Sequence, residues 1–146
     1  LSSDPVKGTF KSPLFYTFKL FSANCTGRSV DTYVDCDTFN TAQYKGIPYL
    51  DVTTVYSAEN KTIFINVINR HQDKAITANI VSHAGKFSGN AEASVINSND
   101  LKGAFTFDKQ GQYHPTMQNI RMANNQLTYS FPPHSFTQIK VTVAGN

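Results

Sequence analysis

The sequence predicts an all-β fold, an antiparallel sandwich or barrel, with one short helix near its N-terminus. Two observations favour this class: polar and apolar residues alternate over most of the chain after Gly27, and polar or glycine-containing turns join the alternating stretches. No helical pattern of about 10–15 residues separates them, which excludes a doubly wound parallel sheet. The 146 residues suffice for one domain with a real core. A TIM barrel, which needs about 250 residues, does not fit.

The helix is predicted over residues 13–23. Its apolar residues fall on one side of a helical turn pattern, and they are Leu14, Phe15, Phe18 and Phe21. Ser12 is placed to cap the helix, and Gly27 is predicted to stop the chain from continuing it. Residues 1–12 show no periodicity, so we expect a tether there and a single domain over 13–146.

Seven strands are expected from the alternating pattern. They lie at residues 28–37, 49–56, 62–69, 75–81, 91–96, 127–131 and 136–143. The strand at 62–69 is apolar on both faces and should therefore be central in its sheet. The stretch 98–125 is long, polar and poorly patterned, which is typical of a functional loop or one docked on a neighbour. Phe105 and Phe107 are the only anchors for a strand in that stretch.

Composition excludes several function classes. The net charge is only +3, and no two basic residues are adjacent, whereas nucleic-acid binding normally shows a clustered basic face. We therefore expect no nucleic-acid partner and no membrane partner, because no apolar run approaches the ~18 residues of a span. No signal peptide is visible, and the chain starts at Leu1 without Met. That start suggests a processed product or an excised piece of something longer.

Metal and cofactor sites are not expected. The two cysteines, Cys25 and Cys36, match no zinc pattern, and no two of the four histidines have chelating spacing. The cysteines form either a disulfide or two buried free thiols, and the sequence favours neither. His134 lies in a turn with two prolines, and we interpret it as a residue that fixes that turn.

Acidic residues are the next candidates for chemistry. Asp31, Asp35 and Asp37 would share one face of the strand at 28–37, where like charges can raise a carboxyl pKa. A solvated strand face is the favoured interpretation of this row. Glutamate appears only at Glu59 and Glu92, on separate predicted elements, so a glycosidase site with two catalytic carboxyl groups is not favoured. No catalytic residue is therefore assigned to this chain.

Tyrosines offer a different kind of site. Exposed aromatic faces stack on sugar rings, with neighbouring polar side chains holding the hydroxyls. Tyr44, Tyr49 and Tyr113 lie near predicted strand ends or in loops, with Asn and Gln nearby, and are candidates for sugar stacking. Packing in the core or in an interface is the alternative use of such tyrosines.

Four segments, in order along the chain, resemble family 51 glycoside hydrolases. They are SVDTYVDCDTF at 29–39, IPYLDV at 47–52, INVINRH at 65–71 and LTYSFPPHSFT at 127–137. Residues 13–21 are similar to the final helix that flanks the barrel in these proteins. The resemblance runs from about residue 13 to 143, which is nearly the whole chain.

The family comprises retaining α-L-arabinofuranosidases, which act on arabinan, arabinoxylan and related glycans. The resemblance implies a catalytic barrel that holds both catalytic Glu residues, followed by a C-terminal β-sandwich of jelly-roll type. This chain resembles only the sandwich. The resemblance therefore implies a fold and a parent enzyme, and it assigns no catalytic residue. A secreted or periplasmic location is favoured over a cytoplasmic one.

Three functions follow as hypotheses. The first is a non-catalytic domain that packs on the catalytic barrel of the same polypeptide and stabilises it, with Phe15, Phe18 and Phe21 as docking residues. The second is a carbohydrate-binding module for arabinose-containing plant cell-wall polysaccharide. The third is an independent enzyme. An assay for release of the aryl group from an aryl arabinofuranoside would decide it, and we expect no release.

Overall fold

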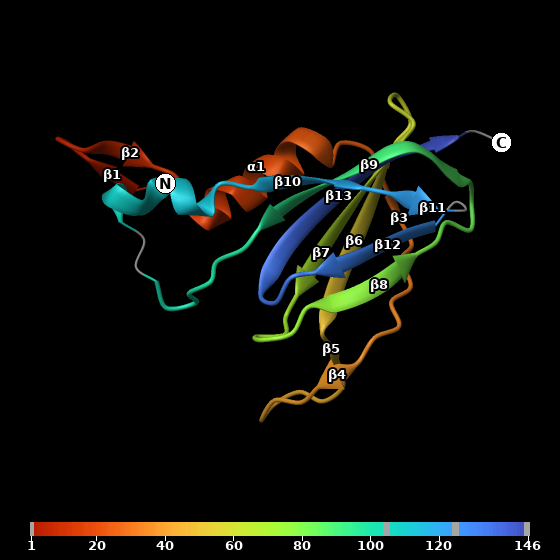
Figure 1. Ribbon diagram of the computed structural model, residues 1–146, viewed down its shortest axis with the longest axis horizontal. Helices are drawn as coiled ribbons and strands as arrows, with labels where there is room; N and C mark the ends of the chain where they lie inside the picture. Colours follow the sequence, from red (N-terminus) through yellow and green to blue (C-terminus); the bar gives the residue numbers. More distant parts are fainter. Residues whose placement is uncertain (1, 104–105, 124–125, 145–146) are drawn as a thin grey trace.

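Two antiparallel sheets pack face to face in the computed structural model, which describes residues 2–103, 106–123 and 126–144 (Figure 1). The larger sheet has the strand order β10-β9-β13-β7-β6-β3. In that order its strands are Thr116–Ile120, Lys86–Ile96, Ser135–Ala144, Thr62–Asn69, Leu50–Ser57 and Arg28–Val30. The smaller sheet has the order β11-β12-β8. Its strands are Met122–Ala123, Gln126–Phe131 and Ile76–Ile80. The predicted all-β antiparallel sandwich is confirmed, and its jelly-roll connectivity stays a prediction.

The main core lies between the two sheets. Every second residue of β13 and β7 points into it, and Ile139, Val141, Ile65 and Val67 are buried there. Leu127, Tyr129 and Phe131 close the core from β12. This is the period-two burial that the alternating sequence predicted, and β7 is central as expected.

The helix α1 (Pro13–Asn24) lies on the outer face of the larger sheet. Tyr16 of the helix is buried against Ile96 of β9 and Phe136 of β13. At its C-terminal end the Asn24 amide donates to Gln138 Oε1 at 2.6 Å. The predicted helix is therefore confirmed. Ser12 sits at the N-cap position, but its side chain makes no capping hydrogen bond.

Residues 1–12 contain structure that the sequence pattern did not predict. The strands β1 (Ser2–Asp4) and β2 (Gly8–Phe10) form a hairpin. Its turn is closed by the Asp4 carboxylate, which accepts hydrogen bonds from the backbone N–H groups of Lys7 and Val6, and these bonds lower the Asp4 pKa. Strands of three residues are too short for a detectable alternation.

The strand predicted at 28–37 is wrong beyond Val30. β3 covers only Arg28–Val30 and pairs with β6 at the edge of the larger sheet. Aspartate is disfavoured in strands, and three of the next seven residues are aspartates, so pairing stops there. Val34 and Cys36 still pack against the core from this irregular segment.

The stretch 98–125 holds more structure than expected. Phe107 begins the short helix η1 (Phe107–Tyr113) instead of anchoring a strand, and Phe105 lies outside the described residues. β10 follows η1 and pairs with β9 along the sheet edge. A second hairpin, β4 (Thr38–Phe39) with β5 (Ile47–Pro48), extends from the far end of the sandwich (Figure 1). Neither helix in the described ranges is long and apolar enough to cross a membrane.

Candidate functional site

The acidic residues do not gather into a catalytic pair. Because the chain leaves the sheet after Val30, Asp31, Asp35 and Asp37 lie on an irregular, exposed segment and not in a row on one strand face. Glu59 lies in the exposed turn after β6, and Glu92 lies in the middle of β9. Within the described residues, no three His, Cys, Asp or Glu side chains are arranged to hold a metal ion.

The two cysteines lie on opposite faces of the larger sheet. Cys25 follows α1, and its Sγ lies 3.4 Å from Nδ2 of Asn66 on the outer face. Cys36 packs against the main core on the inner face. Both are free thiols and both are half-buried, so the structure decides between the two alternatives that the sequence left open.

His134 fixes the turn between β12 and β13, as the sequence predicted. Its two ring nitrogens each lie 2.5 Å from a backbone carbonyl oxygen, one of Gln72 and one of Ser98. Its backbone N–H donates to the carbonyl of His71 at 2.8 Å. One side chain therefore connects three loops at the same end of the sandwich.

Apolar side chains are exposed along one side of α1, and the last of them, Phe21, also contacts the sheet through the Phe136 ring, with centroids 5.5 Å apart. We call Leu14, Phe18 and Phe21 the helix patch; they stand at i, i+4 and i+7, which places them on one side of a helix. Leu14 is 62% exposed and Phe18 is 65% exposed. Phe15, the third docking candidate, is half-buried beside Tyr16, with ring centroids 5.4 Å apart.

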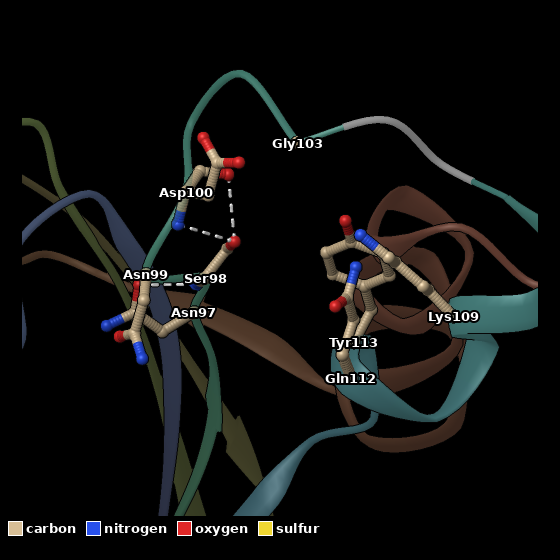
Figure 2. A pocket seen from close by; sticks show the side chains of 8 residues that line it. All are labelled: Asn97, Ser98, Asn99, Asp100, Gly103, Lys109, Gln112 and Tyr113. Atoms are coloured by element: carbon tan, nitrogen blue, oxygen red, sulfur yellow. Dashed lines mark hydrogen bonds between the residues drawn. The ribbon is translucent and has the colours of Figure 1, made fainter.

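One depression lies beside Tyr113, and we call it the Tyr113 depression. Figure 2 shows its two walls, one from the loop after β9 and one from η1. Asn97, Ser98, Asp100, Lys109, Gln112 and Tyr113 contribute to the lining. The volume is about 270 Å³. Tyr113 is only 3% exposed, so its ring offers little surface for a sugar to stack on.

A second depression lies at the end of the sandwich near β5 and β8, and we call it the Tyr49 depression. Its lining includes Asp37, Thr38, Tyr49, His71, Lys74 and Thr77, and its volume is about 640 Å³. The Tyr49 ring contacts two other rings, Phe39 at 4.9 Å and His71 at 4.7 Å between centroids. Tyr44 lies in neither depression and is 66% exposed in the β4–β5 hairpin.

Sequence reasoning found Tyr49 but missed its neighbours Asp37, His71 and Lys74 as parts of one site. They come from separate segments that the fold brings together, and no local spacing indicates such a meeting. The only signal in the sequence was that His71 and Lys74 flank a polar turn between two predicted strands. Asp37 was considered only as part of the acidic row.

Comparison with known proteins gives one family. Residues 3–135 match the family described as the α-L-arabinofuranosidase C-terminal domain. A curated relative, intracellular exo-α-(1→5)-L-arabinofuranosidase 1 of Bacillus subtilis (strain 168), is 25% identical over 133 residues. The match covers 90% of this chain and 26% of the relative.

Several solved structures with the same fold are arabinofuranosidases. The enzyme of Thermotoga maritima in complex with arabinose superposes with a TM-score of 0.79 at 21% identity, covering 94% of this chain and 30% of that one. The family 51 enzyme of Thermotoga petrophila gives a TM-score of 0.77 at 22% identity, covering 91% and 29%. This chain thus spans between a quarter and a third of the length of each of these proteins.

Proposed function

This chain belongs to the family of α-L-arabinofuranosidase C-terminal domains, and from that membership we propose that it is the non-catalytic part of an arabinofuranosidase. In this proposal a catalytic barrel of the same polypeptide carries the chemistry. The sandwich packs on that barrel and stabilises it. The observation that carries the proposal is the helix patch, because the sandwich itself leaves the apolar side chains of Leu14 and Phe18 largely exposed.

Length supports a partner within the same polypeptide. The chain spans 26% of the curated relative and 30% of the Thermotoga maritima structure. In those proteins the remaining sequence lies outside the part that matches this chain. A catalytic domain of that kind is the partner that we propose for this sandwich.

The helix patch has the chemistry of a docking surface between domains. Contiguous apolar side chains on a monomer's surface mark interaction sites, because burying them stabilises the contact. Full burial of a Leu or Phe side chain contributes about 1.5–3 kcal/mol. The opposite side of the same helix is already anchored to the sheet through Tyr16 and Asn24, so α1 presents the patch on a rigid support.

The substrate class is proposed from the relatives. The curated relative is named for exo action on α-(1→5)-linked arabinofuranose. We extend this to the polypeptide that contains the present chain, as an enzyme that removes arabinofuranosyl units from arabinan or arabinoxylan. The sandwich contributes stability and no reacting group.

The test compares the longer polypeptide with this chain alone. Leu14→Ser and Phe18→Ser are expected to lower the melting temperature of the longer polypeptide by several degrees, because each removes about 1.5–3 kcal/mol of interdomain burial. In this chain alone both side chains are exposed, so melting should hardly change. Calorimetry of each variant in both lengths gives the comparison.

Leu101→Ser is the matched control, since Leu101 is 62% exposed, the same as Leu14, but lies outside the helix patch. It should leave melting unchanged in both lengths. The docking proposal would be refuted by equal effects of Leu14→Ser and Leu101→Ser in the longer polypeptide. A reading frame without any upstream barrel-sized segment would also contradict it.

A further inference from the structure

We propose that the Tyr49 depression is a carbohydrate-binding site for a neutral sugar chain, separate from the docking surface on α1. The lining of the depression combines aromatic rings with hydrogen-bonding groups of both kinds. The site would hold polysaccharide beside the enzyme, a role beyond the mechanical one proposed above.

Three segments that are distant in the sequence form the depression. Asp37 and Thr38 come from the irregular segment and the start of β4, Tyr49 from the residue before β6, and Lys74 from the loop before β8. Backbone hydrogen bonds lock these segments together: Tyr49 N–H donates to the Asp37 carbonyl at 3.0 Å, and Arg70 N–H donates to the Tyr49 carbonyl at 2.8 Å. The walls are therefore in place before a ligand arrives, which reduces the cost of ordering them on binding.

Backbone hydrogen bonds hold the neutral His71 ring in one tautomer. Its Nδ1 accepts hydrogen bonds from the backbone N–H groups of Asp73 and Lys74, both at 3.1 Å. A nitrogen that accepts cannot carry the proton, so the proton is on Nε2. Nε2–H has no partner in the described part of the chain, and it is a donor for a ligand hydroxyl.

The lining carries one negative and one positive side chain, so their charges cancel. Asp37 contributes one carboxylate and Lys74 one ammonium, and neither has a hydrogen-bond or ion-pair partner among residues 2–103, 106–123 and 126–144. Together with the Thr38 hydroxyl they offer acceptors and donors at zero net charge. A sugar hydroxyl both donates and accepts, so this set suits a neutral polyhydroxylated ligand better than an anion or a cation.

The aromatic rings supply the apolar part of the site. Tyr49 and His71 are in ring contact at the wall, with centroids 4.7 Å apart, and Ile76 adds an aliphatic surface. Carbohydrate rings carry C–H groups on their faces, which pack on such surfaces while the hydroxyls reach the polar groups. The lining is therefore mainly polar, with Tyr49 and Ile76 as its apolar part, which suits a ligand that carries many hydroxyl groups.

The two depressions differ in volume. Ligand sites commonly have about 300–1,000 Å³. The Tyr49 depression, with about 640 Å³, falls inside this range, and the Tyr113 depression, with about 270 Å³, falls just below it. The buried ring of Tyr113 also contrasts with the half-buried ring of Tyr49. The Tyr49 depression is therefore the better binding site.

The test is an NMR titration of this chain with α-(1→5)-linked arabinotriose, at sugar concentrations up to the millimolar range. Saturable shifts are expected at the backbone amides of Asp37, Thr38, Tyr49 and Lys74. Asp37→Ala should weaken binding about tenfold, the loss expected for a hydrogen bond to a charged group. Asp35→Ala is the matched control, because Asp35 is an exposed carboxylate two residues away that does not line the site.

Three outcomes would overturn the inference: no saturable shifts, shifts centred on Asn97 and Gln112 in the Tyr113 depression, or equal weakening by Asp35→Ala and Asp37→Ala. Galacturonate serves as the charged comparator, and stronger binding of that anion would make this a Lys74 anion site instead. Only the choice of an arabinose probe rests on the proposed function. Failure here leaves the melting comparison at the helix patch untouched, and the reverse also holds.

Discussion

His134 shows how much one side chain contributes to this fold. Its φ of 42° lies in the left-handed region, which costs energy for a residue with a Cβ. The contacts of its two ring nitrogens with the carbonyl oxygens of Gln72 and Ser98 hold the residue in this conformation. The three loops that it joins include the segment with His71 and Lys74, so His134 also supports the wall of the Tyr49 depression.

His134→Ala should lower the free energy of unfolding by about 2 kcal/mol, because it removes the ring that contacts the carbonyls of Gln72 and Ser98. His134→Gly loses the same ring contacts, but glycine adopts a positive φ without strain, so this variant should cost less than His134→Ala. Urea unfolding measures both variants. His83→Ala, at an exposed histidine, is the control, and equal costs for Ala and Gly would show that strain plays no part.

Tyr129 links stability to alkaline pH. Burial raises the pKa of its phenol, whose hydroxyl lies 2.9 Å from Gln118 Oε1. The unfolded chain then loses this proton at a lower pH than the folded chain. The stability that Tyr129 contributes through this pKa difference is fully present below the ordinary tyrosine pKa of about 10. It is lost as the pH rises through the raised pKa of the folded state.

Tyr129→Phe should therefore flatten the decline in stability between about pH 9 and about pH 11. Urea unfolding across that range measures the slope for the parent chain and the variant. Tyr44→Phe is the control, because Tyr44 is exposed. An unchanged slope in Tyr129→Phe would exclude this residue as a source of the alkaline sensitivity.

At the scale of elements, the link between α1 and the larger sheet depends on a close approach at Gly27. A Cβ at this position would lie 2.3 Å from the backbone oxygen of Tyr56 on β6. The sequence suggested Gly27 as a helix stop, whereas the helix ends at Asn24. Gly27 is needed instead so that β3 can pair with β6 directly after the helix.

Gly27→Ala should destabilise the chain by about 1–3 kcal/mol, because the backbone of β6 must shift to accept the methyl group. Gly111→Ala is the matched control, since nothing lies within 4 Å of its Cβ position and its φ is not positive. It should be neutral or stabilising by a few tenths of a kcal/mol. Thermal unfolding of the two variants separates the steric clash at residue 27 from the general effect of replacing a glycine by alanine.

The elements that the sequence predicted are those with a strong local pattern. β6, β12 and β13 carry alternating stretches, β7 is apolar on both faces, and α1 has a helical spacing of apolar residues. The elements that it missed are short or lie at an edge. β10 has one buried residue in five, so its position comes from hydrogen bonds to β9, which no sequence pattern records.

At the scale of the whole molecule, the candidate sites were harder to predict than the fold. The Tyr49 depression is assembled from segments that are distant in the sequence and meet only in the folded chain. The helix patch was indicated by sequence, but which aromatic residues stay exposed depends on how α1 lies on the sheet. Phe15 turned inward toward Tyr16, whereas Leu14, which had not been singled out for docking, is exposed.

The chain alone should release no product from an aryl arabinofuranoside. Its two glutamates lie in a turn and in the middle of a strand, and the aspartates of the irregular segment are exposed to water. A colorimetric assay with the purified chain measures this. Release that disappears in Asp35→Asn or Asp37→Asn would place catalysis on this chain and contradict the proposed function.

The placement of Cys25 and Cys36 on opposite faces of one sheet has a consequence for the settings in which the fold can persist. The sheet itself stands between the two sulfur atoms, so oxidation cannot join them without unfolding the sandwich. Reducing agents such as dithiothreitol should leave the melting temperature unchanged. The sandwich thus needs no bond between these two cysteines, and the same fold can persist in reducing surroundings.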